Sequence, residues 1–164
     1  MEAINELDRA AFAERFGPLF EHSPWVAEAA WHDRPFADRE QLYQALVAAM
    51  YAAPRERKLA LIRAHPDLAG KAAIEGTLTA ESHGEQRSAG LDRLTPDEYA
   101  AFTRINTAYR KRFGFPFVVC VREHTKESIL RVAAERLGNS EDEEIRVALE
   151  EIAKIARLRL EDMA

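Results

Sequence analysis

Cysteine is nearly absent from the sequence: Cys120 is the only one among 164 residues. A single cysteine cannot form an intramolecular disulfide or supply the several thiolates of a cysteine-bound metal, so disulfide-rich secreted folds and cysteine-based zinc sites are excluded. A lone thiol suits a reducing compartment, and we expect the protein to be cytoplasmic. Cys120 lies in an apolar run without a basic neighbour, which predicts a buried packing residue rather than a reactive thiol.

Long apolar runs and an excess of positive charge are also missing. No stretch approaches the roughly 18–20 apolar residues that a membrane span requires, and the N-terminal residues carry too many acids for a signal peptide. The formal net charge is -5, with basic and acidic residues mixed along the chain, whereas nucleic-acid binding favours a basic surface. We therefore expect neither a membrane nor a nucleic acid as a partner.

Three common motifs of catalysis and cofactor binding are absent: HExxH, the phosphate-binding P-loop and GxGxxG. Four of the histidines show no spacing typical of metal ligands. They are His22, His32, His83 and His124. These patterns indicate neither a metal site nor a nucleotide cofactor.

The sequence does contain helical periodicity and the residues that begin and end helices. Hydrophobic residues make up 47% of the chain and recur at helical spacing in almost every segment. The clearest boundaries belong to the segment that follows Thr95. Thr95 is a plausible N-cap, Glu98 completes a capping box with it, and Gly114 can close the helix in a left-handed conformation.

Other segments follow the same pattern less clearly. Thr79 can cap a helix that Gly84 and Gly90 are expected to interrupt. Only residues 115–121 read like a strand, and one strand makes no sheet. The sequence therefore predicts an all-α fold, a single compact helical domain of about seven or eight helices over residues 1–164.

The stretch AHPD ends an amphipathic pattern on His65 and places Pro66 directly after it. Histidine exchanges a proton near neutral pH, and the fixed φ and missing N–H of proline restrain the turn that follows. His65 is therefore a candidate catalytic residue held at a helix end. The alternative is a histidine that caps the helix, or one that is half-buried with its hydrogen bonds satisfied.

The stretch SHGEQ places a hydroxyl, a carboxylate and an amide on one face if it is helical. Ser82, Glu85 and Gln86 have the spacing of neighbours on a helix surface. His83 lies two positions from Glu85 and is expected to point away from it. One face could therefore bind a polar substrate. The alternative is a capping box of Ser82 and Glu85 followed by a solvated face.

The stretch FGFPFVVCVR combines an apolar wall with one cation. Its aromatic residues, which we expect in the core, are Phe113, Phe115 and Phe117. If residues 116–122 are extended, Arg122 shares a side with Pro116, Val118 and Cys120. Its guanidinium could then bind a substrate carboxylate through two parallel hydrogen bonds. The alternative is that Arg122 pairs with a surface acid.

Four stretches, in this order, resemble the OHCU decarboxylases, enzymes that act on 2-oxo-4-hydroxy-4-carboxy-5-ureidoimidazoline, the last intermediate of urate oxidation. The stretches are AHPDLAGK (64–71), ESHGEQRSAGLDRLTPDEYAAF (81–102), INTAYRKRFGFPFVVCVR (105–122) and EIAKIARLRLED (151–162). The resemblance covers most of the chain beyond residue 40, and the segment before it resembles the family only loosely.

The resemblance implies a fold, an activity and a site. Family members are all-helical homodimers that need neither a metal nor an organic cofactor, and they form (S)-allantoin and CO2. His65 matches the family's catalytic histidine, and Glu85 belongs to its matching polar stretch. The residues implied in substrate binding are Pro66, Ser82, Gln86, Phe117, Val118, Val119, Cys120 and Arg122.

These residue types suit a decarboxylation. Loss of CO2 leaves an electron pair on carbon that must be stabilised and then protonated on one face. We expect His65 to handle the proton, and Glu85 to orient either His65 or the hydroxyl of the substrate. Ser82 would donate a positioning hydrogen bond, while Arg122 and the Gln86 amide would hold polar groups of the substrate.

Two other interpretations stay open at this point. Two imidazoles and two carboxylates could bind zinc or iron in a metal-dependent hydrolase of a ureido or cyclic amide compound. They are His65, Asp67, His83 and Glu85. A non-enzymatic helical interaction module would instead bind a partner along the apolar stripe of residues 141–162. We expect that stripe to pack on the core or to form a dimer contact.

Overall fold

The computed structural model describes residues 1–70, 73 and 75–163. Within this part of the chain there are nine α-helices and three 3-10 helices and no strand, which confirms the all-α fold class. Residues 115–121, the stretch that reads like a strand, are irregular up to the 3-10 helix that begins at Val121. Among the helices that the structure describes, we find no candidate for a membrane span.

The chain divides into two compact units. One comprises Met1–Ala64 together with the chain from Ala153 onward, and the other comprises His65–Ile152. The long helix α10 (Glu141–Asp162) contributes to both. That residues 1–164 form a single domain stays a prediction.

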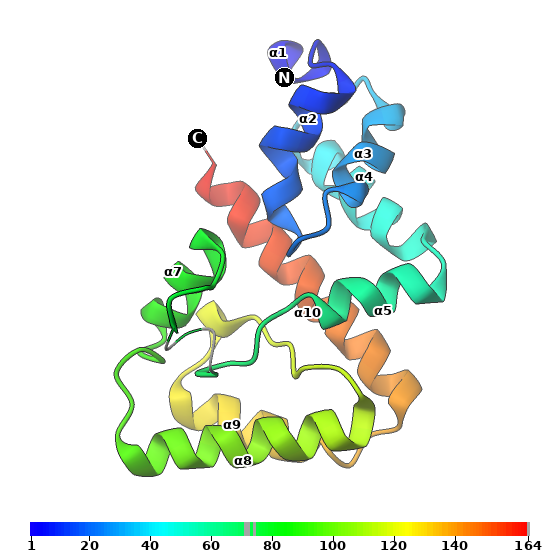
Figure 1. The fold of residues 1–164 in the computed structure, drawn as a ribbon. Coiled ribbons are helices and arrows are strands. Elements are labelled where there is room, and N and C mark those ends of the chain that lie inside the picture. Colours follow the sequence, from blue (N-terminus) through cyan, green and yellow to red (C-terminus); the bar gives the residue numbers. More distant parts are fainter. Residues whose placement is uncertain (71–72, 74, 164) are drawn as a thin grey trace. The chain divides into compact units, whose positions relative to one another are not determined.

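The first unit contains the N-terminal helices and the end of α10 (Figure 1). Its other elements are α1 (Glu2–Asn5), α2 (Arg9–Phe16), η1 (Gly17–Leu19), α3 (Trp25–Ala30), η2 (Trp31–Asp33), α4 (Arg39–Ala52) and α5 (Arg55–Arg63). Helix α3 packs against both α2 and α4, and Phe12, Val26 and Leu42 are completely buried between them. Burial of these apolar side chains is the main force that holds the unit together.

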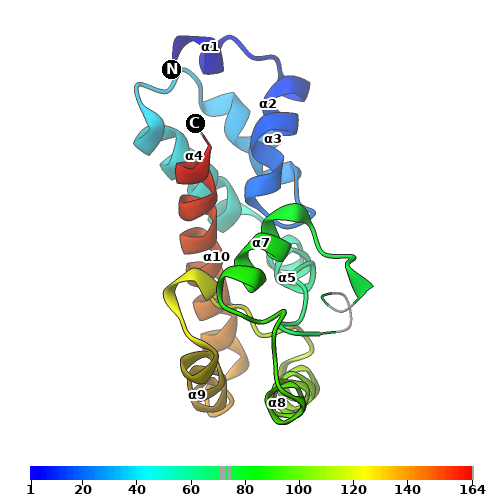
Figure 2. The same cartoon turned by 90° about the vertical axis from the view of Figure 1, so that its left-hand side faces the viewer.

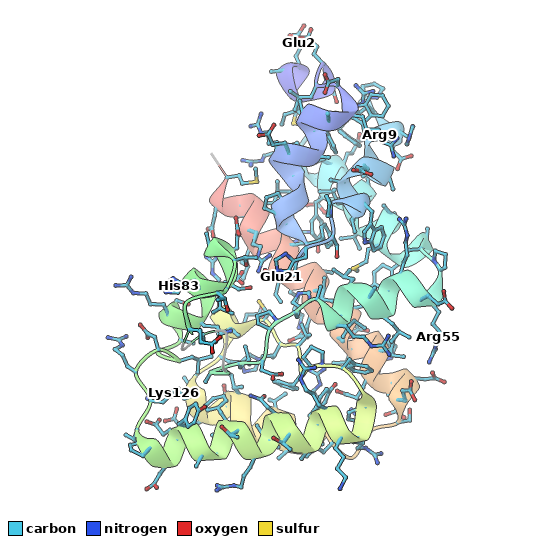
Figure 3. The ribbon with its side chains drawn as sticks, in the orientation of Figure 1. Glu2, Arg9, Glu21, Arg55, His83 and Lys126 are labelled. Carbon is cyan, nitrogen blue, oxygen red and sulfur yellow. The ribbon has the colours of Figure 1, made fainter. Side chains whose placement is uncertain are left out.

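Arginines of α10 anchor its last turns in the first unit. Arg157 forms two hydrogen bonds of 2.9 and 3.0 Å with the carboxylate of Glu40. Arg159 donates from Nη2 to Oε1 of Glu21 over 2.9 Å, and both of these side chains are buried. Glu21 is labelled in Figure 3. These pairs fix the register of α10 against the loop after η1 and against α4.

The second unit contains α7 (Ala80–Ser88), α8 (Pro96–Phe113), η3 (Val121–Glu123), α9 (Lys126–Arg136) and the first part of α10. Helices α8 and α9 lie side by side, and Figure 2 shows both nearly end-on. The predicted boundaries of α8 are confirmed: Thr95 and Glu98 form a capping box, and Gly114 has φ 76°. Only glycine adopts that conformation without strain.

Helix α7 departs from the expectation at Gly84. The helix runs without interruption from Ala80 to Ser88, with Thr79 as its N-cap, and Gly90 with φ 76° lies beyond its end. A glycine inside a helix costs only about 1 kcal/mol relative to alanine. The prediction that Gly84 interrupts the helix was wrong. The Thr79 cap and the two hydrogen bonds that join Gln86 to Ala69 and Asp67 favour the helix despite that penalty.

Tyr109 of α8 is at the centre of an aromatic cluster in the second unit. Its ring centroid lies 4.6 Å from that of Phe113, 5.9 Å from that of Phe115 and 5.5 Å from that of Phe117. All three phenylalanines are buried, as the sequence predicts. The ring contacts with Phe115 and Phe117 pack the irregular segment that follows Gly114 onto α8.

A buried ion pair lies against this cluster. Oε1 of Glu144 accepts from Nε of Arg136 over 2.7 Å and from the hydroxyl of Tyr109 over 2.6 Å. Its other oxygen accepts from Asn139 over 2.9 Å. Burial and the hydrogen bond to Glu144 raise the pKa of Tyr109 far above its usual value, so the phenol stays protonated and donates to the carboxylate.

Glu144→Leu is expected to lower the free energy of unfolding by about 3–5 kcal/mol, because it leaves the Arg136 guanidinium buried without its counter-charge. Urea denaturation measures the loss. The double variant Arg136→Met with Glu144→Leu should recover most of it, since a matched apolar pair leaves no unpaired charge. A single variant as stable as the wild type would contradict the importance of this pair.

Candidate active site

His65 is the first residue of the second unit and is buried, with 7% of its surface exposed. Helix α5 ends at Arg63, and the helix cap is Ala64, whose backbone N–H donates to the carbonyl of Ala60 over 2.9 Å. The capping residue of the backbone is thus Ala64, and the role of the His65 side chain stays a prediction. The structure places His65 in the turn beyond the helix, with Pro66 following it at a partly exposed position.

The turn after Pro66 is held by side chains from two helices. Gln86 of α7 accepts from the backbone N–H of Ala69 over 2.9 Å and donates to the carbonyl of Asp67 over 3.3 Å. Asn106 of α8 donates to the carbonyl of Leu68 over 2.9 Å. The amide oxygen and nitrogen of Gln86 thus bond to two residues of the turn, Ala69 and Asp67, which follow Pro66.

The polar face of α7 is formed as expected, but the capping box is not. Ser82 and Gln86 are buried, Glu85 is partly exposed and His83 is exposed. The side chain that caps α7 is Thr79, which accepts from the backbone N–H of Ser82 over 3.2 Å. Ser82 therefore lies inside the helix, and the alternative of a Ser82–Glu85 capping box is wrong. Figure 3 labels His83 on this helix.

The segment from Phe117 to Cys120 is buried at every residue. Arg136 of α9 donates from Nη1 to the carbonyl of Val118 over 2.6 Å, and its guanidinium carbon lies 4.5 Å from the centre of the Phe117 ring. The backbone N–H of Cys120 donates to Oε1 of Glu151 over 3.3 Å. The prediction that Cys120 is a buried packing residue is confirmed. The backbone of this segment is held by side-chain hydrogen bonds at the carbonyl of Val118 and at the N–H of Cys120.

Arg122 does not lie on an extended strand. It is in the middle of the 3-10 helix η3 and is exposed, so the predicted alternation of Val118, Cys120 and Arg122 on one side was wrong. The reason is local: the N–H of Glu123 donates to the carbonyl of Cys120 and closes a tight turn. Helix α7 nevertheless packs against η3, which brings the segment of Arg122 beside the helix of Ser82, Glu85 and Gln86.

Comparison with known proteins decides the family. The family model described as OHCU decarboxylase matches residues 5–161. The chain belongs to the OHCU decarboxylase family. The resemblance in the four sequence stretches is thereby confirmed, and it extends into the N-terminal segment that resembles the family only loosely by eye.

Individual relatives agree with this assignment. The 2-oxo-4-hydroxy-4-carboxy-5-ureidoimidazoline decarboxylase of Amia calva is 44% identical over 163 residues, which are 99% of this chain and 93% of that protein. The enzyme of the same name from Haloferax volcanii is 43% identical and covers 98% and 93% of the two chains. A crystal structure of (S)-allantoin synthase superposes with a TM-score of 0.77 at 32% identity, over 98% of this chain and 52% of that one.

In this member of the OHCU decarboxylase family, several residues that hold the site segments were not among the predicted catalytic or substrate-binding residues. Asp67 accepts from Nε of Arg110 over 2.9 Å, and Asn106, Arg136 and Glu151 hold the backbone of the two site segments. A signal for Asn106 was present in the sequence. It is a polar residue at a position where α8 otherwise turns its apolar face inward, and a buried amide requires a partner.

An open cavity of about 490 Å³ adjoins the turn. Its walls include Ala69, Leu91, Leu94, Thr95 and Tyr99. Apart from Ala69 and Ala73, its lining residues belong to the segment that leads into α8 and to the first turn of that helix, and none of the predicted site residues lines it. Among the described residues, no group of three or more histidine, cysteine or acidic side chains is arranged to hold a metal ion.

Proposed function

We propose that this protein catalyses the decarboxylation of 2-oxo-4-hydroxy-4-carboxy-5-ureidoimidazoline to (S)-allantoin and CO2, without a metal or an organic cofactor. The observation that carries the proposal is the 44% identity to an enzyme of that name over nearly the full length of both chains. The convergence of the His65 turn, α7 and η3 within one compact unit supports it.

The reaction places two demands on the site. When the bond to the carboxylate breaks, its electron pair forms a carbon–carbon double bond with the ureido-bearing ring carbon, and the neighbouring imine nitrogen takes up a proton. The resulting enol then becomes a carbonyl as its hydroxyl loses a proton and the ureido-bearing carbon gains one. The enzyme must orient the carboxylate, and it must deliver the last proton to one face only.

We assign the proton transfer to His65, because imidazole is the side chain that exchanges protons most readily near neutral pH. Its burial beside Pro66 limits the directions in which the ring can turn. Glu85 orients either this imidazole or the substrate hydroxyl. Delivery of the proton from one fixed direction accounts for a single enantiomer of the product.

The remaining predicted residues bind the substrate in this proposal. Ser82 donates a positioning hydrogen bond and Arg122 pairs with the carboxylate. The nitrogen of the Gln86 amide carries two hydrogens; one bonds the carbonyl of Asp67, and we assign the other to the substrate. The Pro66 ring and the backbone of Phe117, Val118, Val119 and Cys120 complete the pocket.

A coupled assay tests the proposed activity. The unstable substrate is generated from urate in situ, and its disappearance is followed together with the optical rotation of the allantoin formed. We expect faster disappearance than in buffer alone and an excess of the (S)-enantiomer. Spontaneous rates with racemic allantoin would refute the proposal. Loss of activity with a chelator, together with stoichiometric bound metal, would favour the metal-dependent hydrolase instead.

We also propose that the protein is a cytoplasmic homodimer. The single buried thiol, Cys120, supports a reducing compartment, and the dimer is what the family resemblance implies. Light scattering on the purified protein should give twice the mass of one chain. A monomer at micromolar concentration that retains full activity would contradict the dimer.

A further inference from the structure

The turn after His65 adopts a backbone conformation that its residues do not favour. Ala69 has φ 53°, in the left-handed region, which is costly for any residue with a Cβ atom. The neighbouring Gly70 has no room for a side chain, because a Cβ atom there would lie 2.8 Å from Cβ of Asp67. A conformation of this kind persists only where the surrounding contacts impose it.

Two side chains of α8 supply such contacts. Asn106, which is 8% exposed, donates to the carbonyl of Leu68 over 2.9 Å. Arg110 lies one helical turn further along α8 and donates from Nε to Oδ1 of Asp67 over 2.9 Å. Together with Gln86 on α7, they fix the chain at three consecutive residues, Asp67 to Ala69.

The ion pair of Arg110 and Asp67 is poorly placed to stabilise the fold. The side chains are 46% and 29% exposed, and pairs that are this accessible to water contribute little to stability. Its geometry is nevertheless specific, because the pair joins α8 to the residue directly after Pro66. The contact therefore suits positioning of the turn better than holding the domain together.

We propose that Asn106 and Arg110 are positioning residues that hold the turn from Asp67 to Ala69, and thereby the direction of the His65 imidazole, for the decarboxylation. This inference rests on the proposed function. Neither residue is assigned a contact with the substrate. Misplacement of a catalytic group by about 1 Å can cost about 100-fold in rate, so release of the turn should lower kcat more than it raises KM.

Arg110→Met is the decisive variant because it removes the cation at a half-exposed position. We expect kcat to fall by about 10- to 100-fold, with KM changed by less than about threefold and an almost unchanged melting temperature. Arg110→Lys keeps the charge and should recover most of kcat. The matched control is Arg104→Met, which removes an exposed arginine from the same helix and should leave kcat unchanged.

Asn106→Leu tests the second contact but leaves the Leu68 carbonyl without its donor, so this variant can lose stability. Its kcat is therefore measured well below its melting temperature and compared with that of Arg110→Met. Wild-type kcat in Arg110→Met would overturn the proposal. A loss of kcat that follows the unfolded fraction, without recovery in Arg110→Lys, would also overturn it.

Hydrogen exchange separates this proposal from the proposed function. The N–H of Ala69 is bonded to Gln86 in the wild type, and we expect its exchange to be about two- to fivefold faster in Arg110→Met, because opening of the turn is then easier. If the wild type fails to decarboxylate the substrate, the proposed function fails, and the exchange rates still decide whether α8 holds the turn. Unchanged exchange in the variant would refute the positioning role.

Discussion

His65→Ala is expected to lower kcat for decarboxylation by about 10²–10⁴-fold, the usual cost of removing a positioned acid or base. The imidazole is buried and lies in a turn that Gln86 and Asn106 hold in place. No other group can therefore take its position easily. The coupled assay gives kcat, and circular dichroism confirms that the helices stay formed.

The stereochemistry of the residual product provides a second measurement. If His65 delivers the proton, allantoin formed by His65→Ala takes its proton from water, and its optical rotation should fall towards zero. The matched control is His83→Ala, because His83 is exposed on α7 (Figure 3) and should retain the wild-type rate. Wild-type turnover with full optical purity in His65→Ala would refute the role of His65.

The parts of the fold that the sequence predicts correctly are those with local causes. The capping box of Thr95 and Glu98, the left-handed Gly114 and the cap of Thr79 each depend on residues a few positions apart. All the groups that interact in these features lie within about one helical turn of each other, so the sequence pattern alone identifies them. The failure at Gly84 has the opposite origin, because the hydrogen bonds that join Gln86 to Asp67 and Ala69 are tertiary contacts that favour the helix despite a local penalty.

The site is predictable only in part, for a related reason. The helical spacing of Ser82 and Gln86 correctly predicts that they share a face, and both are buried. The bond between Asn106 and Leu68 joins residues 38 positions apart, and no spacing rule indicates such a pair. The left-handed conformation of Ala69 could not be predicted either, since alanine disfavours it and only the contacts from α7 and α8 impose it.

Arg122 shows how a wrong local structure changes the interpretation of a residue. In an extended segment, the alternation of side chains would determine the side on which Arg122 lies. In the structure Arg122 lies in the tight turn of η3, and the packing of η3 against α7 determines its position. The packing of η3 against α7 is a tertiary contact that no local pattern indicates. The role of Arg122 in binding the carboxylate therefore stays a proposal about the substrate rather than a consequence of strand geometry.

Glu85→Ala is expected to lower kcat by about 10²–10⁴-fold as well, because it removes the carboxylate that orients the proton transfer. Glu85 is partly exposed on α7, so the fold should survive the change. Glu85→Gln retains the size and removes the charge, and it should be nearly as slow if the charge is what matters. The control Glu81→Ala removes a carboxylate one turn earlier on the same helix and should keep the wild-type rate.

The double variant His65→Ala with Glu85→Ala decides which partner Glu85 orients. The effects of substitutions on kcat do not multiply when the residues act as one unit. If Glu85 acts only through the imidazole of His65, its removal costs no further rate once the imidazole is absent. The double variant would then be as slow as His65→Ala alone. If Glu85 orients the substrate hydroxyl independently, the two losses in kcat should multiply. A Glu85→Ala variant with wild-type kcat would exclude both roles.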